Sequence, residues 1–360
     1  MKFKVLCFNA WCIPEWTRKI VKFPHREITP NSRHRLERVV KIADEAGCDI
    51  LALTEIWDDS DRQWLSTFAQ SYGYVDSINP LVDGRVTRRI GLAGPGLLVL
   101  SKHPLSLTKF CTYEFNGRPY RVDQGDWLAG KGFVLCEIKL LGKKLNLVLT
   151  HTIASYGDRP VAPHLDGALK DENYYHRLLQ IKKLVGELCK LDNTVPLIVT
   201  GDFNLEPHTT GMRFLKHAAS LRDAWTGTDE EGFTAIAPPN DKRVDYILYR
   251  GKLLLDSCQM IMHGSQTELL SDHLGIVASF QFEQESHPFV GDAEINQIFA
   301  EELQYGKVIL RNQLVGHLCQ IGITGGFMFI VSIPILLGLY GLLELVYCVC
   351  FKFPEYLELP

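Results

Sequence analysis

The sequence lacks the excess of basic residues that is typical of proteins that coat nucleic acid. Its 42 acidic residues outnumber its 38 lysines and arginines, and the formal net charge is −4. Binding through phosphate contacts alone usually requires a clear positive surplus, so we expect no nucleic-acid partner. A local basic patch is still compatible with this charge.

The ten cysteines form no Cys-x-x-Cys pair and are scattered, apart from the neighbours Cys348 and Cys350. The apolar stretch within the opening MKFKVLCFNAWC is short and soon interrupted, which is unlike a signal peptide. We therefore expect a reduced, cytosol-facing domain with buried thiols rather than a disulfide framework. The sequence also contains no internal repeat and no low-complexity segment.

Charged residues are nearly absent from residues 321–351, where Glu344 is the single exception. This run exceeds the ~20 residues that a helix needs to cross a bilayer, and it predicts a membrane anchor. A buried core helix is the alternative, although core helices are rarely apolar on all faces over such a length. Pro334 and several glycines favour one tilted or kinked span over a hairpin.

Alternating and apolar segments predict a strand-rich domain with few, widely separated helices. Strands are expected at residues 2–11, 49–57, 96–101, 133–140, 144–150, 195–200, 244–250, 253–262 and 274–282. Helices are expected at residues 31–46, 61–70 and 171–190, the first capped by Ser32 and ended by Gly47. This order favours two stacked sheets with helices outside over a doubly wound parallel sheet.

Four regions follow from these patterns. Residues 1–284 are expected to form one globular domain, and residues 285–320 an amphipathic segment in which apolar residues such as Phe299 and Leu303 alternate with charges. Residues 321–351 form the anchor, and residues 352–360 form a tail.

Polar residues follow several apolar strands at the point where each strand ends. They are Asn9, Glu55, His151, Asp202 and Asn204, and Asp272-His273 precedes a further strand. A single polar residue in such a place is usually a turn or cap residue. The coincidence of several indicates one shared pocket.

These residues lie within short motifs that occur in a fixed order along the chain. The motifs are Phe8-Asn9-Ala10-Trp11, Leu53-Thr54-Glu55-Ile56-Trp57, Thr150-His151-Thr152, Gly201-Asp202-Phe203-Asn204, Arg243-Val244-Asp245-Tyr246 and Ser271-Asp272-His273. In this respect the chain resembles the endonuclease/exonuclease/phosphatase superfamily over residues 1 to about 283. The resemblance implies an α/β fold, a four-layer α/β/β/α sandwich, and the membrane helix predicted from residues 321–351 is added at its C-terminal side.

The resemblance also implies a role for each residue in metal-assisted phosphodiester hydrolysis. Glu55 would be the principal ligand of Mg²⁺, helped by the side-chain oxygen of Asn9. His273 would be the general base that activates water, with its other ring nitrogen held by Asp245.

A second set of residues would interact with the leaving-group oxygen and with the phosphoryl oxygens of the substrate. Asp202 would protonate or stabilise the leaving oxygen, directly or through a metal-bound water. Asn204 and His151 would hydrogen-bond the phosphoryl oxygens as charge shifts in the transition state. Asp272 would lie nearby without necessarily orienting the base.

Within the superfamily, the chain is most similar to the short, membrane-anchored neutral sphingomyelinase family. The segments Asn9-Ala10-Trp11, Glu55-Ile56-Trp57 and Gly125-Asp126-Trp127-Leu128-Ala129-Gly130-Lys131-Gly132-Phe133 carry this similarity. It implies hydrolysis of sphingomyelin to ceramide and phosphocholine, with choline lysophospholipids as further substrates. The alternatives are a nuclease or a phosphoinositide phosphatase on the same scaffold, or a non-catalytic membrane scaffold.

Two loops could assist the site. Asp126 and Lys131 lie in a glycine-flanked block, and we expect this pair to latch a loop beside the site; a surface ion pair is the alternative. Arg85, Arg88 and Arg89 form a basic cluster that would touch anionic head groups, including an activating lipid, or would be a solvated loop.

The C-terminal region suggests an arrangement on an intracellular membrane such as the endoplasmic reticulum. Lys307 and Arg311 precede the anchor and place the catalytic domain on the cytoplasmic side. Cys348 and Cys350 are candidates for acylation, and Glu344 is a candidate for contact with a partner.

Overall fold

The fold is that of a computed structural model. It describes residues 2–13, 32–79, 94–117, 125–140, 142–156, 171, 173–225, 231–237, 241–264, 269–285, 289 and 291–324. The basic cluster at Arg85, Arg88 and Arg89 lies outside these residues. So do Glu344, Cys348, Cys350 and all but the first four residues of the expected anchor.

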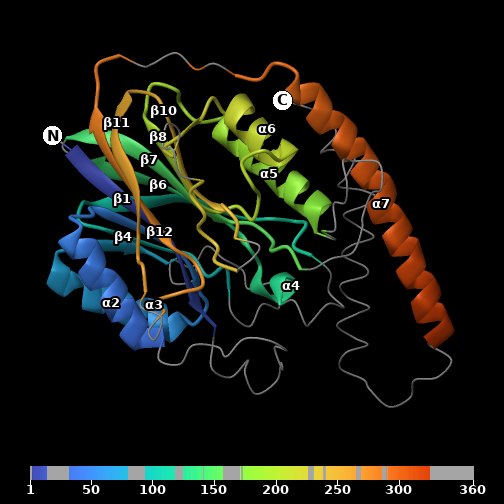
Figure 1. The fold of residues 1–360 in the computed structure, drawn as a ribbon, viewed down its shortest axis with the longest axis horizontal. Coiled ribbons are helices and arrows are strands. Elements are labelled where there is room, and N and C mark those ends of the chain that lie inside the picture. Colours follow the sequence, from blue (N-terminus) through green and yellow to red (C-terminus); the bar gives the residue numbers. More distant parts are fainter. Residues whose placement is uncertain are drawn as a thin grey trace.

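Two six-stranded mixed sheets stack face to face (Figure 1). The first has the strand order β11 (Leu253–Ile261), β12 (Gly275–Phe282), β1 (Lys2–Cys12), β2 (Ile50–Ile56), β4 (Leu98–Ser101) and β3 (Asp76–Ile78). The second has the order β5 (Leu105–Thr112), β6 (Gly132–Leu140), β7 (Lys143–His151), β8 (Leu197–Asp202), β10 (Asp245–Arg250) and β9 (Arg222–Asp223).

Helices cover the outer face of each sheet, as Figure 1 shows. The first sheet is covered by α2 (Ser32–Glu45) and α3 (Asp59–Ala69), which is followed by the 3-10 turn η1 (Gln70–Tyr72). The second sheet is covered by α5 (Tyr174–Leu188) and α6 (Thr210–Ala218), on which α7 (Ile295–Thr324) packs, and a short α4 spans Asp126–Ala129. Three apolar cores separate the four layers, one between the sheets and one beneath each set of helices.

Most of the predicted elements are confirmed. The strands could be predicted because the inner ones are buried on both faces and therefore appear in the sequence as apolar runs. The nine predicted strands match β1, β2, β4, β6, β7, β8, β10, β11 and β12 to within two residues. In α2 the predicted residues Leu36, Val39, Val40 and Ala43 are buried, and Gly47 has a φ of 70° after the helix end.

The prediction of Ser32 as the cap of α2 is wrong. Ser32 is already the first helical residue, and its hydroxyl donates to Asp61 Oδ2 at 2.9 Å. The sequence pattern also missed β5 and α6. The side chains of β5 are at most partly buried, so its alternation is weak, and α6 has only nine residues.

The long helix α7 begins inside the expected amphipathic segment and continues past residue 320. Its residues Ile295, Phe299, Leu303 and Leu310 are buried in the same apolar core as α5 and α6. Among the residues that the structure describes, no helix combines the length and apolar character that crossing a bilayer requires.

Strand register aligns three polar residues at one end of the second sheet. His151 pairs with Asp202 across parallel strands, and Asp202 pairs with Asp245 across antiparallel strands. Gly201 permits this alignment, because its φ is 134° and a Cβ there would lie 1.9 Å from the Thr150 carbonyl oxygen. Only glycine fits where the two backbones approach so closely.

Replacement of Gly201 by alanine should therefore lower the free energy of unfolding by about 3 kcal/mol or more, through strain and separation of β7 from β8. Gly186 in α5 is the matched control, because a Cβ there meets no atom within 4 Å. Gly186→Ala should raise the same quantity by about 0.5–1 kcal/mol. Denaturant unfolding followed by tryptophan fluorescence measures both, and equal effects would contradict the expectation.

Candidate active site

One amide joins the two sheets at the site. Asn9 lies in the last part of β1, and its Nδ2 donates to Glu55 Oε1 and to Asp202 Oδ2, both at 3.0 Å. Asn9 Oδ1 accepts from the Trp11 backbone N–H at 3.0 Å. The side-chain nitrogen of Asn9, rather than its oxygen, therefore faces the two carboxylates.

The backbone is strained where it delivers these groups. Among the described residues, five non-glycine residues have positive φ, and three of them are Trp11 (46°), Glu55 (60°) and Asn204 (48°). Asparagine tolerates this conformation, whereas glutamate and tryptophan adopt it at a cost. All three lie where a strand ends at the site, which is the location expected for strain that the surrounding fold enforces.

His273 and Asp245 form a buried pair opposite Asp202. The distance from His273 Nδ1 to Asp245 Oδ2 is 2.7 Å, and the Asp245 side chain is fully buried. With Asp245 ionised, Nδ1 carries the proton and donates it, so Nε2 is left to accept another. Thr234, whose Oγ1 accepts from the Asp245 N–H at 3.1 Å, fixes the start of β10.

Charge is concentrated in this buried region. Burial, followed by the charge of Asp245, raises the pKa of Asp202 to about 7. Burial also raises the pKa of Glu55, although Lys131 opposes the shift. For His273, burial alone would lower the pKa, but the charges of Asp245, Asp202 and Asp272 raise it well above its ordinary value.

His151 lies between this acidic group and a buried lysine. Its Nε2 is 3.6 Å from Asp202 Oδ2, 3.8 Å from Glu55 Oε1 and 3.0 Å from Lys131 Nζ. Burial and then the charge of Lys131 hold the pKa of His151 well below its ordinary value. The ring is therefore neutral, and its Nε2 accepts a hydrogen bond from the lysine.

Lys131 is paired with Asp126 at 2.5 Å, and each residue is only 3% exposed. Lys131 Nζ also donates to the Thr152 carbonyl oxygen at 3.1 Å. The alternative of a surface ion pair is excluded by this burial. The loop that carries both residues is instead attached to the segment that follows His151.

The remaining predicted residues lie around the same centre. Asn204 donates its backbone N–H to Asp202 Oδ1 at 2.9 Å and its side-chain N–H to the Thr152 carbonyl at 3.1 Å. Asp272 accepts from the Ser271 hydroxyl at 3.4 Å, and its charge reaches Glu55 and His273. The structure thus brings every predicted chemical residue to one end of the sandwich.

The donor set fits a hard divalent cation. Ligand atoms of Glu55, His151 and Asp202 lie within 4.8 Å of one another, and so do those of Asp202, Asp245 and His273. Two carboxylates that share one amide donor repel each other, and a cation between oxygen ligands would offset this repulsion.

Sequence reasoning missed Arg35, which is 5% exposed on α2. Its guanidinium donates to the carbonyl oxygens of Ala10 and Trp11 at 2.9 and 3.1 Å, and also to that of Leu270. Arg35 thereby ties the chain after Asn9 to the chain before Ser271. The sequence did contain a sign of this burial, because Arg35 lies next to Leu36 on the apolar side of the predicted helix.

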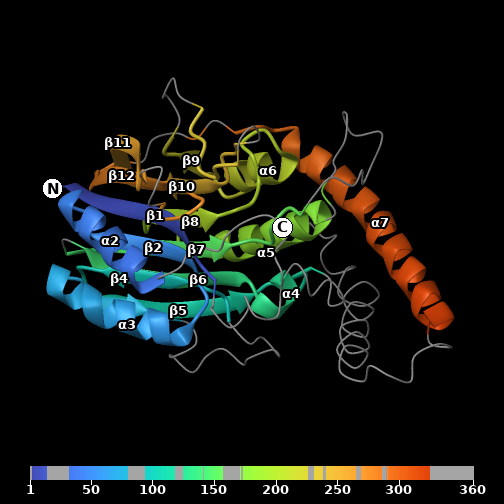
Figure 2. The ribbon, with the colours of Figure 1, turned by 60° about the horizontal axis from the view of Figure 1, so that its bottom comes forward.

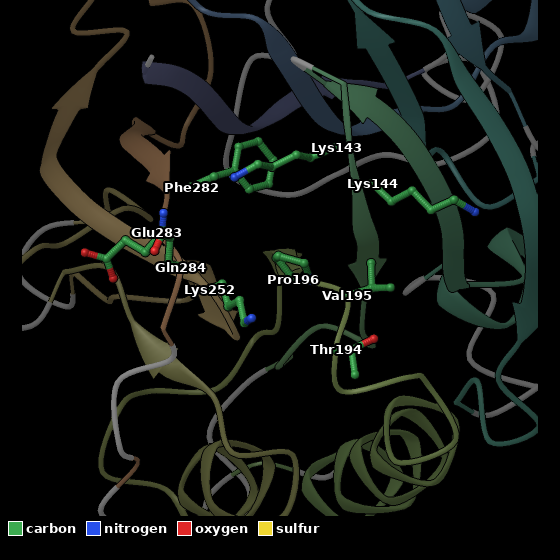
Figure 3. A pocket seen from close by; sticks show the side chains of 9 residues that line it. All are labelled: Lys143, Lys144, Thr194, Val195, Pro196, Lys252, Phe282, Glu283 and Gln284. Atoms are coloured by element: carbon green, nitrogen blue, oxygen red, sulfur yellow. The ribbon is translucent and has the colours of Figure 1, made fainter.

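A surface cavity of about 490 Å³ lies at the opposite end of the strands (Figure 3). It is lined in part by Lys143, at the start of β7, and by Phe282, at the end of β12, whereas His151 and His273 lie at the other ends of these strands. Its lining contains three lysines and one glutamate but no histidine or aspartate. The acidic and histidine groups are therefore not part of this cavity.

Comparison with known proteins agrees with this geometry. Residues 6–273 match the Endonuclease/Exonuclease/phosphatase family, which is well over half of the chain. The chain belongs to the endonuclease/exonuclease/phosphatase family. The matched region includes every residue of the site described above, from Asn9 to His273.

Two curated proteins illustrate how similar the chain is to individual relatives. The human protein Sphingomyelin phosphodiesterase 2 is 27% identical over 69% of this chain and 56% of its own length. Inositol phosphosphingolipids phospholipase C of Saccharomyces cerevisiae is 28% identical over 62% of this chain and 45% of its own. The aligned part of the chain thus spans about half the length of these curated relatives.

A solved structure shows the same fold at low sequence identity. The sphingomyelinase C of Streptomyces griseocarneus superimposes with a TM-score of 0.51 at 17% identity. The superposition covers 78% of this chain and 99% of that structure.

The pKa of His273 should fall when Asp245 is replaced by asparagine, because the main charge that favours the imidazolium is removed and burial then dominates. Asp272→Asn should cause a smaller fall, since its influence on His273 is the weaker one. NMR titration of histidine-labelled, metal-free protein measures both values, with the His273→Ala variant assigning the signal. An unchanged pKa in Asp245→Asn would contradict the pairing.

Proposed function

We propose that the chain is a Mg²⁺-dependent phosphodiesterase that hydrolyses sphingomyelin to ceramide and phosphocholine. The observation that carries the proposal is the His273–Asp245 pair, which faces the high-pKa carboxyl group of Asp202 and the Glu55–Asn9 cluster. The similarity to proteins named as sphingomyelin phosphodiesterases supports this substrate class.

His273 and Asp202 have complementary tasks in this reaction. In its neutral form, His273 takes a proton from water through Nε2, the water oxygen forms a bond to phosphorus, and Asp245 stabilises the imidazolium that results. The neighbouring carboxylates raise the pKa of His273, and the positive charge of a bound Mg²⁺ would oppose this shift and favour the neutral ring. The bond from phosphorus to the ceramide oxygen breaks, and Asp202 gives that oxygen a proton. A pKa of about 7 makes Asp202 available in the protonated form near neutral pH.

Mg²⁺ would be held principally by Glu55, with Asn9 beside it. When bound, the ion supplies charge that polarises a phosphate oxygen. In the structure the side-chain nitrogen of Asn9 faces Glu55. Asn9 would therefore offer its oxygen as a ligand only after its amide group flips, so that oxygen and nitrogen exchange places. His151 and Asn204 would hydrogen-bond the phosphoryl oxygens.

Residues 321–351 would hold the enzyme at the cytoplasmic face of an intracellular membrane, such as the endoplasmic reticulum. A lipid with two chains stays in the bilayer, so an anchored enzyme meets it in two dimensions. An anionic lipid could act as activator. Choline lysophospholipids and inositol phosphosphingolipids are the nearest alternative substrates, the latter because of the yeast relative.

The full-length protein should release phosphocholine from sphingomyelin in mixed micelles with Mg²⁺ and lose this activity in a chelator. His273→Ala should lower kcat by about 10²- to 10⁴-fold, as expected for loss of a general base. The same assay is run with inositol phosphosphingolipid, lysophosphatidylcholine, a phosphoinositide and labelled DNA. Cleavage of DNA or of the phosphoinositide without cleavage of sphingomyelin would overturn the proposal.

The buried Asp126–Lys131 pair is proposed to position the loop beside His151. Asp126→Ala and Lys131→Ala should each lower stability by about 3–5 kcal/mol, since each leaves one charge buried and unpaired. The neutral double variant Asp126→Asn/Lys131→Met should recover much of this stability. It should not recover kcat, because the contact from lysine to His151 is still missing, and wild-type turnover in the double variant would remove the proposed role.

A further inference from the structure

The first half of α7 is attached to the catalytic domain by closely fitted contacts. The ring of Phe299 stacks on that of Phe214 in α6, with centroids 3.7 Å apart and an interplanar angle of 7°. Gly306 lies against the ring of Tyr175 in α5, and a Cβ at this position would lie 2.3 Å from that ring. These contacts require α7 to approach α5 and α6 in one particular register.

A charged group fixes this register between the two contacts. Glu302 Oε2 accepts a hydrogen bond from the Tyr174 hydroxyl at 2.7 Å, and Glu302 Oε1 accepts one from the Thr210 hydroxyl at 2.6 Å. Tyr174 is the first residue of α5 and Thr210 is the first residue of α6. We call these three residues the Glu302 clasp.

The clasp has the features of a specific attachment. Tyr174 and Thr210 are only 4% and 8% exposed, so the two donors are shielded from water, whereas Glu302 is partly buried. Hydrogen bonds to a carboxylate are stronger than those between neutral groups. Burial and the nearby Glu302 raise the pKa of Tyr174, which keeps its hydroxyl protonated as a donor.

Beyond the clasp, the same helix leads to the apolar segment. Helix α7 continues without interruption to Thr324, and its sequence contains no proline. Thr324 lies 22 positions after Glu302, which corresponds to roughly 33 Å at ~1.5 Å per residue. Figure 2 shows this part of α7 extending away from α5 and α6. A displacement of α7 at the clasp would therefore also move the far end of this helix at Thr324.

We propose that the Glu302 clasp positions the catalytic domain relative to the lipid surface, and that it thereby serves hydrolysis of substrates within a bilayer but not of soluble diesters. This role rests on the proposed function, because it concerns the access of that site to its lipid. Glu302, Tyr174 and Thr210 are positioning residues, since none of them belongs to the site at Glu55, Asp202 and His273.

A competing role is transmission into the site through α5. On this helix, Arg177 donates to the Ile153 carbonyl at 3.1 Å, and Gln180 accepts from the Ile153 N–H at 2.9 Å. Ile153 follows His151 and Thr152 closely, so a disturbed α5 could alter the chemistry itself. The two roles predict different results with a soluble substrate.

The test compares two substrates with the same choline head group. One is sphingomyelin in phosphatidylcholine vesicles, and the other is the water-soluble diester 4-nitrophenyl phosphocholine. Glu302→Ala and the double variant Tyr174→Phe/Thr210→Val each remove the clasp in the full-length protein. Glu301→Ala is the matched control, because Glu301 is exposed and accepts a hydrogen bond from Gln297 within the same helix.

We expect both clasp variants to lose about 10-fold or more of wild-type kcat/KM on vesicles, the equivalent of about 1.4 kcal/mol. Their kcat/KM on the soluble diester should equal that of wild type, and the control should match wild type on both. An equal loss on both substrates would overturn the proposal in favour of transmission through α5. Unchanged hydrolysis of vesicles would overturn it as well.

Amide hydrogen exchange tests the attachment of α7 independently of enzymatic activity. Amide protection over residues 295–310 should fall in the clasp variants and stay unchanged in Glu301→Ala, while protection of β7 and β8 stays at the wild-type level. If wild type hydrolyses neither choline substrate, the proposed function fails. The exchange data then still decide whether the clasp holds α7, and wild-type protection in both clasp variants would show that it does not.

Discussion

The enclosure of three carboxylates at one end of a stacked pair of sheets is the constraint on which the rest of the site depends. Glu55, Asp202 and Asp245 repel one another and lose hydration there, so the fold must supply compensating groups. The Asn9 amide joins the first two, and the His273 ring pairs with the third. A pKa of about 7 for Asp202 is the consequence of incomplete compensation, and it suits that group to proton transfer.

The fold delivers these groups through strand register and local strain. Parallel pairing of β7 with β8 sets His151 beside Asp202, and Gly201 allows the backbones to approach. Positive φ angles at Glu55 and Asn204 turn the chain where strands end. Arg35 and Lys131 hold the surrounding segments through backbone carbonyls. The geometry is therefore a property of the whole sandwich rather than of any one loop.

The outer layer of the second sheet connects this site to the C-terminal helix. Helices α5 and α6 lie between β7–β8 and α7, and each begins with a residue that binds Glu302. One layer thus supports the active-site strands on its inner side and α7 on its outer side. Any attachment of the chain to a lipid surface through residues beyond α7 would act on the catalytic domain through this layer.

Local sequence patterns predicted the inner strands, α2 and most of the candidate site residues, because apolar runs and strand-end polar residues can be recognised without distant contacts. The family resemblance added the others, such as Asp245. The burial of the Asp126–Lys131 pair and the direction of the Asn9 amide became visible only in the folded chain. The same holds for the partners of Arg35 and Glu302. These features depend on which distant segments meet, such as Glu302 with Tyr174, and no local pattern encodes contacts between residues so far apart in the chain.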